Sequence, residues 1–546
     1  GVNMTVEEYN SAPKLDFDTY NKLTFTGLES GSTSNVLFNG NTYSIGTASN
    51  VYIENTGTYD VESKGTSTFA LTSNVVDTVT QVVKYDYSQA QSTEQKITAS
   101  DAASNDLFGW SVSLSGDYAI VGARGNSGTG AAYIYTRNTS TGGWVGEQKI
   151  QASDKASDDR FGYSVSLSGD YAIVGARNED TGGSNAGAVY IYTRNTSTGQ
   201  WGDEQKIQAS DKASEDQFGG SVSIDGDYAI VGANGNSGTG AAYIYKRDAS
   251  TGVWGSVQKI QASDAASQDY FGVSVSLSGD YAIVGAFGDD SFTGAIYIYK
   301  RNISTGVWGD EQKIYASDKA SDDRFGESVS INGDYAIVGA RNEDTGGSNA
   351  GAAYIYKRNA STGVWGDEQK IQASDKASDD HFGGSVSING DYSIVGARNE
   401  DTGGSNAGAA YIYKRNGTTW SQQQKIQASD KATNDQFGYS VSLNDTGHTI
   451  VGAYGDDSST GAAYIYTAPN SVPKLTHDGY KLVVKNITPT STTLKYGSNT
   501  YEIGSATNIY VKDTGAYTAE IGSAADFAFT SNTVSGTIKT IEPGFA

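Results

Sequence analysis

One short sequence is repeated seven times along the middle of this chain, and no other feature constrains the fold as strongly. Successive copies begin 53, 57, 53, 54, 57 and 55 residues apart. Each copy opens on a Phe-Gly pair, whose phenylalanines are Phe108, Phe161, Phe218, Phe271, Phe325, Phe382 and Phe437. Self-similarity at a nearly constant period predicts one supersecondary unit per repeat, with neighbouring units burying each other's apolar faces.

The second copy shows what that unit is. Residues 164–167 and 188–193 alternate polar and apolar side chains, residues 171–174 are an apolar run, and Trp201 begins a further segment through 204–208. A Ser-Gly pair at 168–169 suits a two-residue hairpin turn, because Gly tolerates a positive φ. Each repeat therefore predicts four antiparallel strands. Seven such sheets predict an all-β chain with a seven-bladed β-propeller, and a linear solenoid is the alternative.

The last repeat lacks its fourth strand. It ends at 461–466, without the Trp and Gln-Lys-Ile segment, whereas an unpaired Glu-Gln-Lys-Ile segment precedes the first Phe-Gly pair at 94–97. We expect residues 94–98 to become the outer strand of blade seven, because this pairing removes an exposed edge and closes the ring. The chain would then enter the ring near Ser92 and leave it near Thr467, at one place.

The repeated residues resemble a known family. Phe-Gly, followed about fourteen residues later by Val-Gly-Ala and then by Gly-Ala-Ala-Tyr-Ile-Tyr, is similar to the FG-GAP repeat of integrin α-subunit propellers and their microbial relatives. That resemblance implies an integrin-like propeller. Repeats of this kind often carry a calcium loop, Asp-x-Asp-x-Asp-Gly, between the first two strands, and here only Ser-Gly-Asp or Asn-Gly-Asp stands there. The chain therefore resembles a branch without the calcium loop.

The segments flanking the repeats are copies of each other. Residues 13–76 and 473–534 share Pro-Lys-Leu, Asn-Thr-Tyr and Thr-Ser-Asn elements at matching places. The Asp-Thr-Gly-Ala-Tyr element at 513–517 is similar to the tyrosine corner of immunoglobulin-like sandwiches. The expected domains are small β-sandwiches at 1–80 and 472–546 on either side of a propeller at 90–467.

Composition excludes several classes of function. The formal net charge of −24 disfavours nucleic acid and anionic lipid as partners. The chain has no Cys and only three His, and we find no spaced metal-ligand pair, no Ser-His-Asp set and no apolar run long enough to span a bilayer. It begins Gly-Val-Asn without a basic and apolar leader, so we expect a processed chain or a fragment of a longer one.

Two aspartates recur before every Phe-Gly pair, seven and two residues upstream. Paired carboxylates bind calcium or, more commonly, cap the backbone of tight turns, so we consider both a metal site and capping. These candidates are Asp101, Asp106, Asp154, Asp159, Asp211, Asp216, Asp264, Asp269, Asp318, Asp323, Asp375, Asp380, Asp430 and Asp435.

The loops between the second and third strands are acidic and vary between blades. Variable loops on a fixed scaffold are where binding usually occurs, and solvated surface turns are the alternative. The candidate binding residues are Asn178, Glu179, Asp180, Asp289, Asp290, Asn342, Glu343, Asp344, Asn399, Glu400, Asp401, Asp456 and Asp457.

The loops between the third and fourth strands hold Asn-x-Ser/Thr sequences. These are glycan acceptors in a secreted glycoprotein, or ordinary turns stabilised by the Asn side chain. The candidates are Asn138, Asn195, Asn302, Asn359 and Asn416, and the third blade has Asp248 instead. One tryptophan at the same place in six repeats predicts structural packing.

Together these features predict a non-enzymatic extracellular module with a structural or adhesive role, on a secreted, cell or virion surface. The duplicated flanks suggest one tile of a filament or appendage, whose partners are other copies of the chain or neighbouring modules. The alternative is a receptor that binds a glycan or a surface protein through the acidic loops. An enzyme would require a cluster of unlike polar residues at the ring centre, which near-identical blades disfavour. We expect no cofactor, calcium being the one cation considered.

Overall fold

The computed structural model describes the side chains of residues 94–138, 141–444 and 447–466, and outside these ranges it describes only strand backbone. The chain divides into two units. One unit is Ser92–Ala468, and the other comprises Gly1–Gln91 and Pro469–Ala546.

Each flanking segment contains a three-stranded and a four-stranded sheet, and the strand order is the same in both. The N-terminal sheets have the orders β4-β1-β7 and β3-β2-β5-β6, and the C-terminal sheets have β39-β36-β42 and β38-β37-β40-β41. In both segments the first strand pairs parallel with the last. The N-terminal strands are β1 (Asn21–Phe25), β2 (Thr33–Phe38), β3 (Asn41–Gly46), β4 (Asn50–Ile53), β5 (Gly57–Lys64), β6 (Thr68–Val76) and β7 (Gln81–Val83). The C-terminal strands are β36 (Tyr480–Val484), β37 (Thr492–Tyr496), β38 (Asn499–Glu502), β39 (Asn508–Val511), β40 (Gly515–Ile521), β41 (Asn532–Val534) and β42 (Lys539–Ile541). The side chains of the expected tyrosine corner at 513–517 lie outside the described residues.

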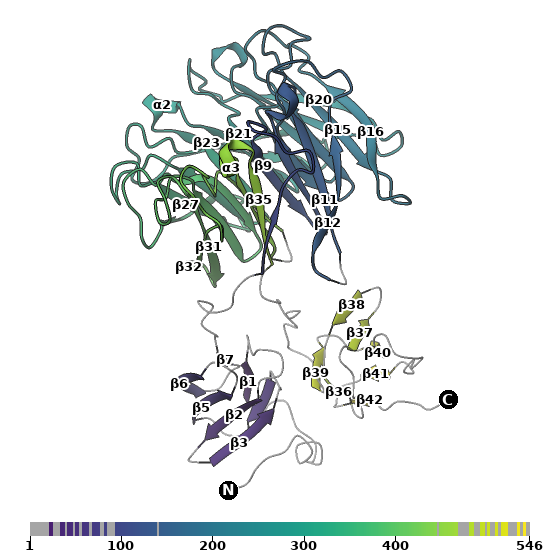
Figure 1. Ribbon diagram of the computed structural model, residues 1–546, viewed down its shortest axis with the longest axis vertical. Coiled ribbons are helices and arrows are strands. Elements are labelled where there is room, and N and C mark those ends of the chain that lie inside the picture. The colour runs from purple at the N-terminus through teal and green to yellow at the C-terminus, as the bar shows by residue number, and fades with distance from the viewer. Residues whose placement is uncertain are drawn as a thin grey trace. The chain divides into compact units, whose positions relative to one another are not determined.

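The unit Ser92–Ala468 is an all-β propeller of seven four-stranded antiparallel sheets (Figure 1). The first strands of blades one to seven are β9 (Phe108–Ser115), β13 (Phe161–Ser168), β17 (Ser221–Asp225), β21 (Ser274–Ser278), β25 (Ser328–Asn332), β29 (Phe382–Asn389) and β33 (Ser440–Leu443). The second strands are β10 (Tyr118–Ala123), β14 (Tyr171–Ala176), β18 (Tyr228–Ala233), β22 (Tyr281–Ala286), β26 (Tyr335–Ala340), β30 (Tyr392–Ala397) and β34 (Thr449–Ala453). The third strands are β11 (Ala131–Arg137), β15 (Ala188–Arg194), β19 (Ala241–Arg247), β23 (Ala295–Arg301), β27 (Ala352–Arg358), β31 (Ala409–Asn416) and β35 (Ala462–Thr467). The fourth strands are β12 (Trp144–Ile150), β16 (Trp201–Ile207), β20 (Trp254–Ile260), β24 (Trp308–Ile314), β28 (Trp365–Ile371), β32 (Thr419–Ile426) and β8 (Thr93–Ile97).

Among the described residues of this unit, helical structure is limited to single turns in the loops after the second strands. These are the 3₁₀ turns η3 (Asn126–Gly128) and η4 (Asn236–Gly238) and the short helices α2 (Asp289–Phe292) and α3 (Asp456–Ser459). Within the part of the chain that the structure describes, no helix is long and apolar enough to cross a membrane.

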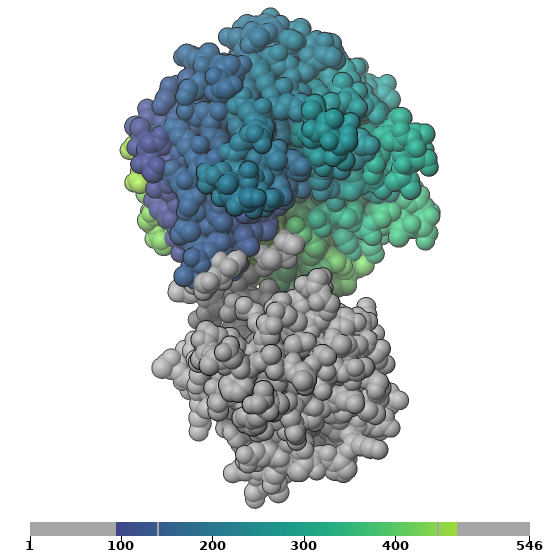
Figure 2. Space-filling model, turned by 90° about the vertical axis from the view of Figure 1, so that its right-hand side faces the viewer, coloured from purple at the N-terminus to yellow at the C-terminus, as the bar shows by residue number. Residues whose placement is uncertain are grey.

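The first strands form the inner ring. Each contacts the first strand of the next blade, and β33 contacts β9, so the cycle is closed. In Figure 2 the colours follow the blades around this ring. The seventh sheet is completed by β8, which pairs antiparallel with β35 from Thr93↔Thr467 to Ile97↔Ala463. The N-terminal strand thus lies where the missing fourth strand of the last repeat predicts it.

The core consists of seven separate apolar clusters, each lying between two neighbouring blades. One cluster packs Ile120, Ile134 and Ile150 of blade one against Phe161 and Tyr190 of blade two. The last cluster packs Ile97, Ile450 and Ile465 of blade seven against blade one. Burial therefore depends on the ring, because a single blade leaves half of its apolar surface without a partner.

The Phe-Gly and Val-Gly-Ala elements of neighbouring blades meet at their glycines. A Cβ on Gly122 would lie 2.1 Å from the carbonyl oxygen of Gly162, and a Cβ on Gly452 would lie 2.0 Å from that of Gly109. Only glycine permits this approach of two backbones. The repeated motif is therefore an interface between blades as well as a marker of each blade.

Serines on the first strands link the blades in a second way. The hydroxyl of Ser113 accepts a hydrogen bond from the backbone N–H of Leu167 in the next blade, at 3.1 Å. The remaining donor and acceptor pairs, all at 3.1 or 3.2 Å, are Ile224 with Ser166, Leu277 with Ser223, Ile331 with Ser276, Ile388 with Ser330, Leu443 with Ser387, and Leu114 with Ser442. This cycle satisfies inner-edge N–H groups that have no partner strand.

Candidate functional site: the acidic loops at one end of the propeller

All the predicted acidic residues lie at one end of the propeller. In each blade the first strand begins at that end and the second strand ends there, so the loop between blades and the loop after the second strand are neighbours. The loops between the third and fourth strands lie at the opposite end, where Thr93 and Thr467 are paired. We call the first of these ends the acidic end.

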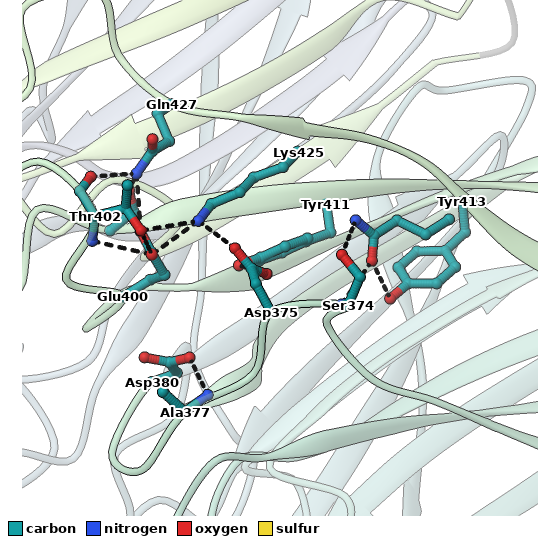
Figure 3. A network of polar contacts seen from close by, with 12 residues as sticks. Ser374, Asp375, Ala377, Asp380, Glu400, Thr402, Tyr411, Tyr413, Lys425 and Gln427 are labelled. Carbon is teal, nitrogen blue, oxygen red and sulfur yellow. Dashed lines mark hydrogen bonds and ion pairs between the residues drawn. The ribbon is translucent and has the colours of Figure 1, made fainter. Parts of the chain in front are cut away.

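The first aspartate of each pair binds a lysine and a tyrosine of its own blade. In blade six, Asp375 accepts the hydroxyl of Tyr411 at 2.9 Å and lies 2.6 Å from the ammonium of Lys425 (Figure 3). The same lysine and tyrosine contacts, with N–O distances from 2.5 to 2.7 Å, are made by Asp101, Asp154, Asp211, Asp264, Asp318 and Asp430. Both carboxylate oxygens of the first aspartate thus have a partner in every blade.

The second aspartate caps the loop between blades. Asp380 is buried and accepts the backbone N–H of Ala377 at 2.7 Å (Figure 3). The equivalent contact, at 2.5 to 2.9 Å, is made by Asp106, Asp159, Asp216, Asp269, Asp323 and Asp435. The second aspartate therefore caps the backbone of a tight turn, which is one of the two interpretations of the pair.

The acidic loops after the second strand divide into inward and outward residues. Glu400 is buried and lies 2.8 Å from the ammonium of Lys425, so this lysine bridges Glu400 and Asp375 (Figure 3). The other buried acids paired with lysine in this way are Glu179, Asp289, Glu343 and Asp456, and in blades one and three Asn126 and Asn236 take the position. The next residue is exposed in every acidic loop, at Asp180, Asp290, Asp344, Asp401 and Asp457. The preceding Asn178, Asn342 and Asn399 are half-buried.

The pKa values of the two aspartates in blade six shift in opposite directions, because their hydrogen-bond partners differ. For Asp380, burial raises the pKa to about 6, supported by Glu400 and Asp375 and opposed by the Ala377 N–H. For Asp375, burial also acts upward, but the hydrogen bonds from Lys425 and Tyr411 outweigh it and the pKa is lowered. The pKa is raised, as in Asp380, for Asp159, Asp269, Asp323 and Asp435, each in a blade with an acid at the buried loop position.

A lysine occupies the place between carboxylates that a cation would take. In blade seven the ammonium of Lys96 lies 2.7 Å from Asp430 and 2.9 Å from Asp456. Burial opposes the charge on Lys96, but both hydrogen bonds outweigh it and raise its pKa. Over residues 94–138, 141–444 and 447–466, no group of three or more His, Cys, Asp or Glu side chains is arranged to hold a metal ion.

The glycan candidates lie in exposed turns at the opposite end. The side-chain oxygen of Asn195 accepts the backbone N–H groups of Ser197 and Thr198, at 2.9 and 3.1 Å. Asn302 and Asn359 do the same, and so does Asp248 in the third blade. The turn requires a side-chain oxygen that accepts these backbone N–H groups. Both Asn and Asp provide this oxygen, so Asp248 can take the place of Asn in the third blade. Asn138 accepts the N–H of Thr141 at 3.1 Å, and Asn416, at the end of β31, is exposed. Glycosylation stays a prediction.

Sequence reasoning missed the lysine of each Gln-Lys-Ile segment and the glutamine before it. The glutamine bridges blades: Gln148 donates to the carbonyl of Trp201 at 2.6 Å and accepts its N–H at 2.9 Å. The tryptophans themselves are buried at the blade edges, which confirms the packing role. The signal for the lysine was available, since one cation recurs beside recurring acids in all seven repeats.

Comparison with known proteins bears on this fold. No curated protein matches the chain. Among solved structures the chain is similar to that of Saccharomyces cerevisiae Sqt1, with a TM-score of 0.34 and 11% identity over 67% of this chain and 87% of Sqt1. The model of the FG-GAP repeat matches seven times, at residues 92–135, 144–192, 201–245, 254–299, 308–356, 365–413 and 420–466. Because these matches cover more than half of the chain, one per blade, the chain belongs to the FG-GAP repeat family.

Proposed function

We propose that this chain is a non-enzymatic adhesive or structural module of an extracellular surface, with the propeller protruding from a row of small immunoglobulin-like sandwiches. The propeller belongs to the branch of the family without the calcium loop. Partners would be other copies of the chain or neighbouring modules, bound through the sandwiches, in a filament or appendage.

One observation supports this proposal most directly. The chain enters the propeller at Thr93 and leaves it at Thr467, and these two residues are paired neighbours. The propeller is thus inserted into a chain whose preceding and following segments have the same strand order. A second supporting point is that the aspartate, lysine and tyrosine contacts at the acidic end recur in all seven blades, as expected of residues repeated for the architecture.

The test is self-association of the full chain. Sedimentation velocity over a hundredfold concentration range, with electron microscopy of the same samples, would show linear oligomers. Residues 92–468 alone are the control and should stay monomeric. A full chain that is monomeric at every concentration would overturn the filament role.

A second candidate function, a receptor that binds through its acidic loops, is favoured by the outward aspartates. Asp180, Asp344 and Asp401 are exposed, and each follows a glutamate that a lysine holds in place. Changing all three to Asn should abolish retention on a glycan or cell surface, with and without calcium. Equal retention of this variant and the unchanged chain would exclude the acidic loops as the binding surface.

A further inference from the structure

Three positions at the acidic end of the two inner strands hold a different residue in almost every blade. The residue before Phe-Gly is Leu107, Arg160, Gln217, Tyr270, Arg324, His381 or Gln436. The residue after Phe-Gly is Trp110, Tyr163, Gly220, Val273, Glu327, Gly384 or Tyr439. The residue after Val-Gly-Ala is Arg124, Arg177, Asn234, Phe287, Arg341, Arg398 or Tyr454. Residues that differ between otherwise similar blades are not needed for the fold of the blade. Such residues are therefore candidates for ligand binding.

These side chains meet around the axis of the ring. The ring of Trp110 in blade one lies 5.7 Å from that of Tyr163 in blade two and 4.5 Å from that of Tyr439 in blade seven. Tyr439 also interacts electrostatically with Arg124 of blade one and Arg398 of blade six. Arg341 of blade five is within electrostatic range of Tyr439 as well. Residues from five blades therefore form one cluster, which we call the axial cluster.

The axial cluster is cationic within a strongly acidic chain. It contains six arginines, namely Arg124, Arg160, Arg177, Arg324, Arg341 and Arg398. Among the described residues one ion pair forms in the cluster, between Arg341 and Glu327 at 2.9 Å. The Nε atoms of Arg124, Arg177 and Arg324 are buried without a hydrogen-bond partner in the described part of the chain. The Nε atoms of Arg194 and Arg301 on the third strands also lack a hydrogen-bond partner in the described residues, but each of these arginines forms an ion pair with an aspartate.

Aromatic rings hold the arginines in place. The guanidinium of Arg124 lies 3.5 Å from the ring centre of Trp110, and that of Arg177 lies 4.4 Å from the ring centre of Tyr163. A guanidinium stacked on a ring keeps its N–H edge available for a planar oxyanion. Arg177 donates one N–H to the hydroxyl of Tyr163, and its Nε has no hydrogen-bond partner in the described residues. Burial lowers the pKa of Arg124, and the like charges of Arg160 and Arg177 act in the same direction. An anion between these groups would relieve that repulsion.

The surroundings of the axial cluster limit the shape of its ligand. Three residues beyond Arg177, Arg341 and Arg398, the acidic loops expose Asp180, Asp344 and Asp401. A long polyanion crossing the acidic end would meet these carboxylates, whereas a compact anion entering along the axis would not. The geometry thus favours a ligand whose negative charge is concentrated at one tip.

We propose that the axial cluster binds a compact oxyanion bearing carboxylate or sulfate groups, held by Arg124, Arg160 and Arg177. The anion is either a free small molecule or the terminal acidic residue of a glycan, since both present the same chemistry to the guanidinium groups. This site goes beyond the proposed structural role, because assembly through the flanking segments does not require it.

The first test is calorimetric titration of the full chain with citrate and with inorganic sulfate at low ionic strength. We expect saturable binding of citrate that weakens as sodium chloride is added. The double variant Arg124→Gln/Arg177→Gln should reduce the affinity at least tenfold. Arg194→Gln/Arg301→Gln is the matched control, since it removes the same charge from the third strands, and it should bind like the unchanged chain. Thermal melting of each variant checks folding.

A variant that should raise the affinity for citrate provides a second test if the arginine variants fail to fold. Glu327→Gln removes the one carboxylate paired in the cluster and should strengthen citrate binding severalfold. Binding of oligosaccharides that end in glucuronic acid is then compared with binding of those that end in glucose. Binding of the first alone indicates an acidic glycan terminus as the ligand, and binding of citrate without either oligosaccharide indicates a free anion. Both ligands fit the proposal. Absence of citrate, sulfate and glucuronide binding, or an equal loss of affinity in the Arg194→Gln/Arg301→Gln control, would overturn the proposal. Self-association is measured in a separate experiment, so the filament proposal and the anion-site proposal can fail independently.

Discussion

Single residues in this propeller show how a charged group is accommodated by its neighbours. The buried loop position is an acid in five blades and Asn in two. The hydrogen bonds and the pKa of the second aspartate depend on which residue is there. In blades one and three, Asn126 and Asn236 donate to Asp106 and Asp216, at 3.0 and 3.1 Å. In the other five blades an acid faces the second aspartate, whose pKa is raised. An Asn at this position thus donates a hydrogen bond to the second aspartate, where an acid would repel it.

We predict opposite pH responses for two aspartates in one loop. The native-state pKa of Asp380 is about 6, above the unfolded value of about 3.9, so this group favours the native state increasingly as pH falls from 7 to 5. Asp380→Asn keeps an acceptor for Ala377 and removes the charge. It should stabilise the protein by about 1 kcal/mol at pH 8, allowing for partial exposure, and by less at pH 5. Urea unfolding at both pH values measures this.

Asp375→Asn is the control for that prediction. Because the pKa of Asp375 is lowered in the native state, its charge contributes stability above pH 4 that is lost as pH falls further. The variant should be destabilised at pH 7, and its difference from the unchanged protein should shrink in acid. Parallel pH profiles for the two variants would contradict the assignment of the aspartates to different environments.

At the scale of strands, the blades are joined by polar contacts that the apolar pattern does not indicate. The Ser-Val-Ser alternation of the first strands predicts a half-buried strand, and the valines are buried as expected. The serines, however, serve the neighbouring blade by accepting its backbone N–H groups. A hydroxyl is short enough to reach across the inner ring without filling it.

Ser223→Ala should therefore cost stability without creating a large cavity. The N–H of Leu277 would lose its partner, which costs about 1 to 2 kcal/mol when the group is shielded from water. Ser304→Ala, in an exposed turn, should change the unfolding free energy by less than about 0.5 kcal/mol. Chemical denaturation of both variants tests the difference, and equal costs would argue against the serine ring.

The strand β8 is the one blade component supplied from the far end of the repeat region, and Lys96 binds it to blade seven. Lys96→Met removes the ammonium between Asp430 and the buried Asp456. We expect a loss of about 2 to 4 kcal/mol and faster hydrogen exchange at 93–97 and 462–467. Lys425→Met breaks the equivalent bridge in a covalently continuous blade, so it should cost similar stability without local opening at β32. Equal local exchange in both variants would contradict this role.

For the whole molecule, closure of the ring decides cooperativity. Each apolar cluster spans two blades, so opening one blade exposes surface on both sides. A protein of residues 92–468 should melt in one transition close to that of the propeller in the full chain. A protein of residues 99–468 lacks β8 and leaves the outer edge of β35 unpaired, and its melting temperature should fall by roughly 10 °C or more. Adding a peptide of residues 92–99 should restore part of the loss.

The number of blades, their four strands and the closing strand could be predicted because they depend on local patterns that recur along the chain. A period-two alternation, a Ser-Gly turn and a missing fourth strand are each visible within one repeat length. The repeat also implies that neighbouring units pack against each other. The close approach of Gly122 and Gly162 is one such contact.

The orientation of the polar side chains was decided by the tertiary structure. Glu400 and Asp401 are adjacent and both acidic, yet one is buried against Lys425 and the other is exposed, because the loop turns between them. The axial cluster depends even more on the ring. Trp110 and Tyr439 are far apart in the sequence and lie 4.5 Å apart only because seven blades close upon themselves. The sequence by itself determined the blades and their number, since these follow from local repetition, whereas contacts across the axis exist only once the ring is closed.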